Sequence, residues 1–202
     1  MLTRLKKKFQ SKIASVAEKL GNAGFTPNTM SLLGILLAVL SAAFYINAKD
    51  SHLFTFLAAV LLLLSGLCDA LDGAIARVCS KTTVFGGFFD SVLDRYADAL
   101  VYSAIILGGL CELHWGAIAL VGSLLVSYTR ARAEAEKVNM ESVGLMERPE
   151  RIIIVAIATL AGIYVEDALN FGILLLAVLT NITVVQRIFY FYKKTKPNKS
   201  GT

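Results

Sequence analysis

The sequence predicts an all-α membrane protein in which six transmembrane helices follow an amphipathic interfacial helix. Three observations lead to this prediction. Charged residues make up only 17% of the 202 residues and apolar residues 56%, whereas soluble domains carry about 25% charged residues. The apolar residues form several runs long enough to cross a hydrocarbon core, which takes about 20 residues each. The basic residues gather in alternate connections between those runs.

Residues 1–20 are expected to form the interfacial helix. Apolar residues recur there at steps of three and four, which places them on one helical stripe: Leu2, Leu5, Phe9, Ile13, Val16 and Leu20. Six Lys and Arg residues precede Gly21 and lie largely off the stripe, where they can approach anionic headgroups. A helix that packs on a partner in the cytosol is the alternative. The segment lacks the central apolar block of a signal peptide.

Residues 21–202 are expected to form one membrane domain. A break rich in Gly, Pro and Asn covers residues 21–28, and charged residues separate the apolar runs that follow. The expected spans are 29–48, 52–77, 86–109, 113–136, 150–166 and 168–192.

The charge distribution predicts the orientation of these spans. An even number of spans places both termini on one side, together with the basic connections at 77–81 and 130–151. By the positive-inside rule this side faces the cytoplasm, so we expect a multi-pass protein of the cell membrane. The net charge of +5 resides in these segments and not on a basic soluble domain, which argues against a nucleic-acid partner. The three cysteines show no metal-ligand spacing and are expected to be free thiols.

Four aspartates fall within or beside otherwise apolar runs. Asp69 and Asp72 are three residues apart, and Asp90 and Asp94 four apart, so each pair shares one helical face. A charge deep in a bilayer costs at least about 2.5–3.5 kcal/mol, and such residues face a bundle interior or a wet cavity. If the two faces oppose each other, four carboxylates converge near the cytoplasmic helix ends.

Converging carboxylates need counter-charge, and divalent cations supply it. Ligation by oxygen without His favours Mg²⁺, Mn²⁺ or Ca²⁺ over Zn²⁺. Two such ions about 3.5–4 Å apart are the usual clamp for displacement at phosphorus. Gly73 and Gly86 lie beside the acids and would let a phosphate or nucleotide approach the backbone, although close helix packing explains them equally well. A cation transporter that binds its cargo with these aspartates is the alternative from another functional class.

The acidic residues belong to a longer pattern, Asp69-x2-Asp72-Gly73-x2-Ala76-Arg77-x8-Gly86-x3-Asp90-x3-Asp94, with eight specified positions in 26 residues. It resembles the signature of the CDP-alcohol phosphotransferases. The resemblance implies a six-helix membrane fold, usually a homodimer, with a site that opens to the cytoplasm. It also implies that an acceptor hydroxyl attacks the β-phosphorus of a CDP-linked lipid and that CMP leaves.

The same resemblance implies roles for individual residues. Asp69, Asp72 and Asp90 would bind Mg²⁺ or Mn²⁺, with two ions per site. Asp94 would contact a metal and act as general base. The CDP-lipid would be bound by Asn28, Ser31, Gly73, Arg77 and Thr83. Asp98 lies outside the signature, and we expect it to support the metal ligands without binding metal or to form an ion pair, with Arg95 as a candidate partner.

Three further segments resemble the branch of the family that makes phosphatidylinositol phosphate, including archaeal relatives that use CDP-archaeol. They are residues 127–134, 147–151 and 185–187, and Arg130 stands where that branch more often has Lys. Independently of the family, Arg187 lies in an apolar run and needs an anionic partner, while Arg130 and Arg151 lie at the ends of their runs.

Three converging guanidiniums would suit a phosphate, so we predict that Arg130, Arg151 and Arg187 bind the phosphate of an acceptor such as inositol 1-phosphate. Glycerol 3-phosphate or another polar alcohol would also fit this pocket, and the sequence does not distinguish a diacylglycerol from an archaeol lipid. Arg132 and Arg148 are expected to anchor the helices at the membrane or to pair with Glu134 or Glu147.

Overall fold

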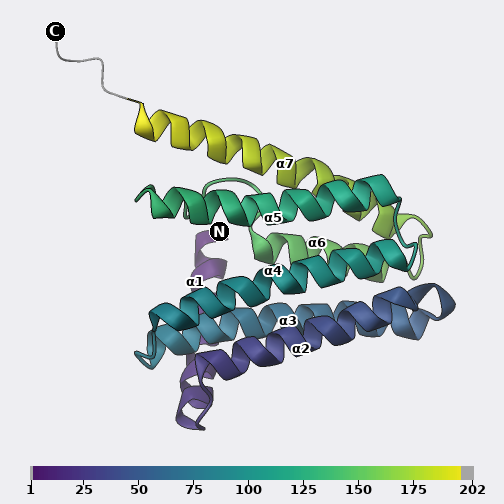
Figure 1. The fold of residues 1–202 in the computed structure, drawn as a ribbon. Coiled ribbons are helices and arrows are strands. Elements are labelled where there is room, and N and C mark those ends of the chain that lie inside the picture. Colours follow the sequence, from purple (N-terminus) through teal and green to yellow (C-terminus); the bar gives the residue numbers. More distant parts are fainter. Residues whose placement is uncertain (1, 197–202) are drawn as a thin grey trace.

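The computed structural model describes residues 2–196, with side chains from residue 12 onward. Every regular element in this range is a helix (Figure 1). The helices are α1 (Leu2–Asn22), α2 (Pro27–Ile46), the short 3₁₀ helix η1 (Ala48–Asp50), α3 (His52–Val78), α4 (Val84–Leu107), α5 (Leu113–Ala135), α6 (Arg148–Ala161) and α7 (Ala168–Thr195). The all-α prediction is therefore confirmed.

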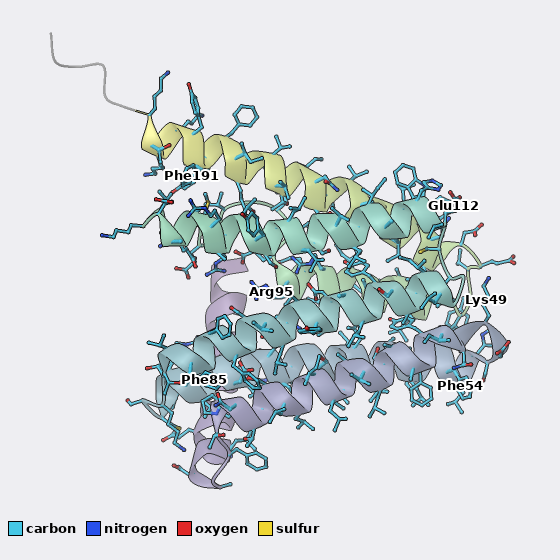
Figure 2. All side chains as sticks on the ribbon, viewed as in Figure 1. Lys49, Phe54, Phe85, Arg95, Glu112 and Phe191 are labelled. Carbon is cyan, nitrogen blue, oxygen red and sulfur yellow. The ribbon has the colours of Figure 1, made fainter. Side chains whose placement is uncertain are left out.

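Helices α2 to α7 run along one another in alternating directions, and α1 crosses them near one end (Figure 1). The α1–α2, α3–α4 and α5–α6 connections lie at the end where α7 finishes, and the remaining connections lie at the opposite end. Figure 2 shows Lys49 and Glu112 at the second end and Phe85 and Phe191 at the first. The basic connections thus gather at one end of the bundle, as the charge pattern predicted.

Local sequence explains where the helices begin. Thr26 caps α2 through a reciprocal pair of hydrogen bonds with Thr29, and Pro27 occupies the first turn. Thr83 caps α4, its Oγ1 accepting from the Gly86 amide at 2.9 Å. These two caps place the first turns of α2 and α4 next to the acidic residues described below.

The expected spans agree with the helices to within a few residues, with one exception. Helix α6 ends at Ala161, five residues before the predicted limit, because the chain turns at Gly162. With 14 residues it is only about 21 Å long, less than the roughly 30 Å of a hydrocarbon core. Helices α2, α3 and α7 are long and apolar enough to cross a membrane.

Small and polar residues join some of the helices within an otherwise apolar core, and the outside of the bundle is apolar as well. The Ser41 hydroxyl donates to the Ala58 carbonyl and the Ser65 hydroxyl to the Gly34 carbonyl, both at 2.8 Å, which joins α2 to α3 through small residues. Large apolar side chains such as Leu36 remain exposed on the outer faces of the helices. A surface of this kind suits lipid, and together with the family described below it indicates a membrane protein.

Helix α1 packs on the end of α3. Ala17 is fully buried there, and Ile13 and Leu20 contact the same cluster. The helix continues to Asn22, two residues past the predicted limit. A Cβ on Gly21 would lie only 2.3 Å from Cys79 Sγ, so glycine at this position permits the close contact between α1 and the end of α3. Val16 is 47% exposed. The predicted residues Leu2, Leu5 and Phe9 lie outside the described side chains.

Candidate metal and nucleotide site

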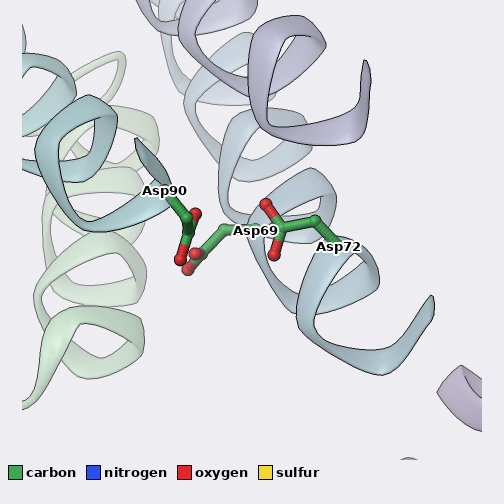
Figure 3. Close-up of side chains that lie close together, drawn as sticks. All are labelled: Asp69, Asp72 and Asp90. Carbon is green, nitrogen blue, oxygen red and sulfur yellow. The ribbon is translucent and has the colours of Figure 1, made fainter. Parts of the chain in front are cut away.

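Three of the predicted carboxylates meet at the contact between α3 and α4. Asp69 and Asp72 come from successive turns of α3, and Asp90 comes from the second turn of α4 (Figure 3). One oxygen from each carboxylate lies within 4.8 Å of the other two. The expected convergence of two helical faces is therefore present, and its oxygen-only donor set suits a hard divalent cation.

Asp94 lies one turn beyond Asp90 and lines the same narrow space. All four aspartates border a cavity of about 10 Å³, together with Ser31 and Arg148. Asp72 is 4% exposed, and its Oδ2 accepts a hydrogen bond from Ser31 Oγ at 2.7 Å. Ser31 therefore orients a predicted metal ligand, in addition to lying beside the predicted nucleotide site.

A larger cavity of about 130 Å³ adjoins the acids, where the start of α2, the end of α3 and the start of α4 meet. Asp72 and Asp90 line this cavity, and so do four of the five residues predicted to bind the CDP-lipid. These four are Asn28, Ser31, Gly73 and Thr83. Arg77, the fifth, is exposed one turn after Gly73, and its guanidinium lies 3.2 Å from where a Cβ on Gly73 would be. The structure thus brings the predicted nucleotide-binding residues together.

Gly86 completes the wall of this cavity. A Cβ there would lie 2.8 Å from Thr83 Oγ1 and 3.2 Å from Asn28 Oδ1. Both neighbouring atoms belong to predicted nucleotide contacts. Glycine at this position therefore keeps the cavity open. This favours a role for Gly86 in nucleotide binding over a role in helix packing alone.

Arg148, the first residue of α6, reaches into the acidic cluster. Its Nη1 lies 2.8 Å from Asp69 Oδ2 and 2.5 Å from Asp94 Oδ1, and the side chain is 13% exposed. The predictions of a membrane anchor or of a pair with Glu134 or Glu147 were wrong for this residue. Arg148 and Arg151 are three residues apart at the start of one helix, so the sequence alone shows that they share a helical face. Their acidic partners lie 50 or more positions away, and the sequence does not indicate which acids these are.

Asp98 forms the expected ion pair, but its partners are Arg151 and Arg148 and not Arg95. Asp98 Oδ2 lies 2.6 Å from Arg151 Nη2, and Asp98 Oδ1 lies 3.4 Å from Arg148 Nε. Arg95 instead donates to the Ser91 carbonyl and lies 3.8 Å from Asp94. An Asp98 carboxylate between Arg148 and the buried Arg151 fixes the start of α6 against α4.

The three arginines predicted to bind the acceptor phosphate have different partners. Arg130 is exposed and pairs with Glu134 at 2.9 Å, and buried Arg151 pairs with Asp98. Arg187 is 2% exposed, and it donates to the carbonyls of Val126 and Val143.

Hydrogen bonds with Thr183 and Arg187 hold the connection between α5 and α6 against α7. Thr183 Oγ1 accepts from the amides of Leu145 and Met146 at 3.3 and 3.1 Å. Arg187 Nε donates to the Val143 carbonyl at 2.9 Å. No pattern in the sequence indicated these contacts, which place Arg148 at the acidic cluster.

Comparison with known proteins bears on this geometry. The family model described as CDP-alcohol phosphatidyltransferase matches residues 25–185. The chain belongs to this family. It is accordingly an enzyme that transfers a substituted phosphate from a CDP-alcohol, as the motif predicted. The matched region includes all four aspartates and both cavities described above.

Family members of similar length resemble the chain over most of their sequence. The archaetidylinositol phosphate synthase of Pyrococcus horikoshii is 36% identical over 195 residues, covering 96% of this chain and 98% of the relative. That of Methanothermobacter thermautotrophicus is 40% identical over 168 residues, covering 83% of each chain.

Solved structures of Mycobacterium tuberculosis phosphatidylinositol phosphate synthase resemble the fold. The one with CDP-DAG bound has a TM-score of 0.77 and 31% identity, covering 94% of this chain and 97% of that one. A second, in complex with manganese and citrate, has a TM-score of 0.76 and covers 94% and 92%. A divalent-metal site in the acidic cluster is consistent with these relatives.

Proposed function

We propose that this enzyme transfers the phosphatidyl-type group of a CDP-lipid to a hydroxyl of inositol 1-phosphate and releases CMP. The observation that carries the proposal is that aspartates of the eight-position motif form one acidic cluster beside a cavity of about 130 Å³, with buried Arg151 nearby. The names of the relatives support inositol phosphate as the acceptor. The lipid is CDP-archaeol or CDP-diacylglycerol.

The acidic residues suit two Mg²⁺ or Mn²⁺ ions, with Asp69, Asp72, Asp90 and Asp94 as ligands. Their donor set is all carboxylate oxygen, and three of the four already lie within 4.8 Å of one another. When bound, such ions polarise phosphoryl oxygens and lower the pKa of a coordinated hydroxyl. Ser31 keeps Asp72 in the orientation that this cluster requires.

The remaining site residues position the two substrates. Asn28, Ser31, Gly73 and Thr83 hold the cytidine diphosphate in the cavity that they line, and Arg77 neutralises its diphosphate from beside Gly73. Asp94 accepts the proton of the attacking hydroxyl. Its position next to the other acids supports this role, since the base must reach the hydroxyl in the place where the phosphorus is held.

Arg130, Arg151 and Arg187 are proposed to bind the phosphate of the acceptor. Arg130 is the one most readily available, because its pair with Glu134 is exposed and such pairs contribute little stability. The forked guanidiniums match phosphate oxygens. Substrate binding would require Arg151 or Arg187 to share its present partners with that phosphate.

We further propose that α2 to α7 all cross the membrane, with both termini and the active site at the cytoplasmic side. The segment 1–20, which makes up most of α1, is proposed to lie in the interface beside the domain formed by 21–202. The basic connections at one end of the bundle support this orientation. Short α6 can be accommodated because its neighbours α3 and α7 cover it. A homodimer is proposed from the resemblance to the family.

The test is CMP release by purified protein in detergent with Mg²⁺ and CDP-archaeol or CDP-diacylglycerol. Inositol 1-phosphate, inositol, serine and glycerol 3-phosphate are supplied in separate reactions, with EDTA as control. We expect turnover with inositol 1-phosphate and none with EDTA. Turnover with glycerol 3-phosphate alone would keep the proposed chemistry and refute the acceptor.

A further inference from the structure

Arg148 occupies a position that a cation at the acidic cluster would otherwise take. Its Nη1 contacts Asp69 and Asp94 together, at 2.8 and 2.5 Å. These two residues lie on different helices, α3 and α4, so that one guanidinium bridges the two walls of the site. A positive charge at this distance from two carboxylates repels any second cation that approaches the same oxygens.

The guanidinium is held in place from behind. Its Nε lies 3.4 Å from Asp98 Oδ1, and Asp98 is in turn fixed by Arg151 at 2.6 Å. Asp98 and Arg151 are 8% and 2% exposed, and Pro149 stiffens the turn that carries both arginines. The cavity on this side has a volume of about 20 Å³ and is lined by Asp98 and both arginines. Arg148 is therefore a built part of the site and not a mobile surface side chain.

Formal charge shows what this arrangement does. Asp98 is balanced by Arg151, which leaves four aspartates at the site together with Arg148 and with Arg95, 3.8 Å from Asp94, and so two negative charges in excess. One divalent ion neutralises this excess. A second divalent ion would leave two positive charges, which is unfavourable until an anionic diphosphate arrives.

We propose that Arg148 is a positioning residue that supplies the counter-charge for Asp69 and Asp94 while substrate is absent, and that it competes with the second divalent ion for these carboxylates. The inference rests on the two-ion site proposed above. The free enzyme then binds one ion tightly at Asp69, Asp72 and Asp90, and it binds the second ion weakly until the CDP-lipid brings its negative charge. Asp69 can serve both partners because its carboxylate has two oxygens.

The experiment is a Mn²⁺ titration of the full-length protein in detergent without CDP-lipid, with free Mn²⁺ followed by electron paramagnetic resonance. Wild type is compared with Arg148→Gln and with the matched control Arg132→Gln. The Arg132→Gln substitution also removes one positive charge, but Arg132 is exposed and pairs with Glu136 at 2.7 Å, and not with an aspartate of the acidic cluster. We expect one tight ion in wild type and in the control. In Arg148→Gln the Kd of the second ion should fall by about tenfold or more, because contact between unit charges near a protein surface is worth more than that factor.

Arg148→Lys is the second variant, in case the glutamine variant does not fold. A lysine keeps the charge, but a single ammonium on a different stem cannot contact Asp69, Asp94 and Asp98 with a fork. Its second-ion Kd should fall between the values for wild type and for Arg148→Gln. An unchanged or higher second-ion Kd in folded Arg148 variants, or two equally tight ions in wild type, would overturn the inference and leave the metal site standing. A wild type that binds no Mn²⁺ would instead overturn the proposed metal site itself.

Discussion

Asp98 provides a sharp test of how the buried charges stabilise this protein. The substitution Asp98→Asn keeps the size of the side chain and removes its charge, which leaves Arg151, 2% exposed, facing an uncharged amide at a contact of 2.6 Å. Removing one partner of a buried ion pair typically costs about 3–5 kcal/mol, because the remaining charge stays desolvated. For a chain of 150–250 residues each kcal/mol shifts Tm by about 2–4 °C, so even the lower cost predicts a fall of about 6–12 °C.

The assay is thermal unfolding of the purified protein in one detergent, with a double-mutant cycle. Asp98→Asn, Arg151→Gln and the double variant are compared with wild type, and the double variant should lose less than the sum of the two single losses. Glu136→Gln is the control, since the exposed Arg132–Glu136 pair should contribute about 0.5 kcal/mol or less. A fall of under 2 °C for Asp98→Asn, or additive losses in the cycle, would refute the buried pair.

Three further predictions follow from the site. Asp94→Asn should abolish CMP release but leave Mn²⁺ binding at Asp69, Asp72 and Asp90, and loss of all Mn²⁺ binding would show that Asp94 is mainly a ligand. Gly86→Ala should raise the KM for the CDP-lipid at least about tenfold with a smaller change for the acceptor, because the methyl group would crowd Thr83 and Asn28; an unchanged KM would show that the nucleotide lies elsewhere. In a protein with Cys79 replaced by Ser, maleimide added to intact cells should label Lys49→Cys, on the outer side, and not Lys81→Cys, on the cytoplasmic side. The reverse labelling pattern would show that the protein has the opposite orientation in the membrane. Background from Cys111 should be low there, because burial raises the pKa of its thiol to about 11 and keeps it protonated at neutral pH.

Local patterns predicted most of the helices and the metal ligands. The limits of α2, α3 and α7 follow from apolar runs, and the spacing of Asp69, Asp72 and Asp90 places these residues on facing helix surfaces. Helix α6 was predicted too long, because its apolar composition continues past Gly162 although the backbone turns there.

The sequence could not predict the ion pairs that cross the bundle. Arg148 contacts acids on both α3 and α4, and which of several nearby carboxylates it meets depends on how those helices pack. The same holds for Arg187, whose partners include two backbone carbonyls that no side-chain pattern reveals. Charge spacing within one helix was informative, whereas pairing between helices required the fold.

The fastening of the α5–α6 connection to α7 has a consequence for biosynthesis. Thr183 and Arg187 hold the segment that delivers Arg148 to the acids, and both residues belong to α7, which is synthesised after α3 to α6. Until α7 packs against the other helices, the nascent chain holds its aspartates without this fixed guanidinium. The arrangement of the acidic cluster is thereby coupled to the packing of α7, so a chain that stalls before α7 lacks the contacts that hold Arg148 in place.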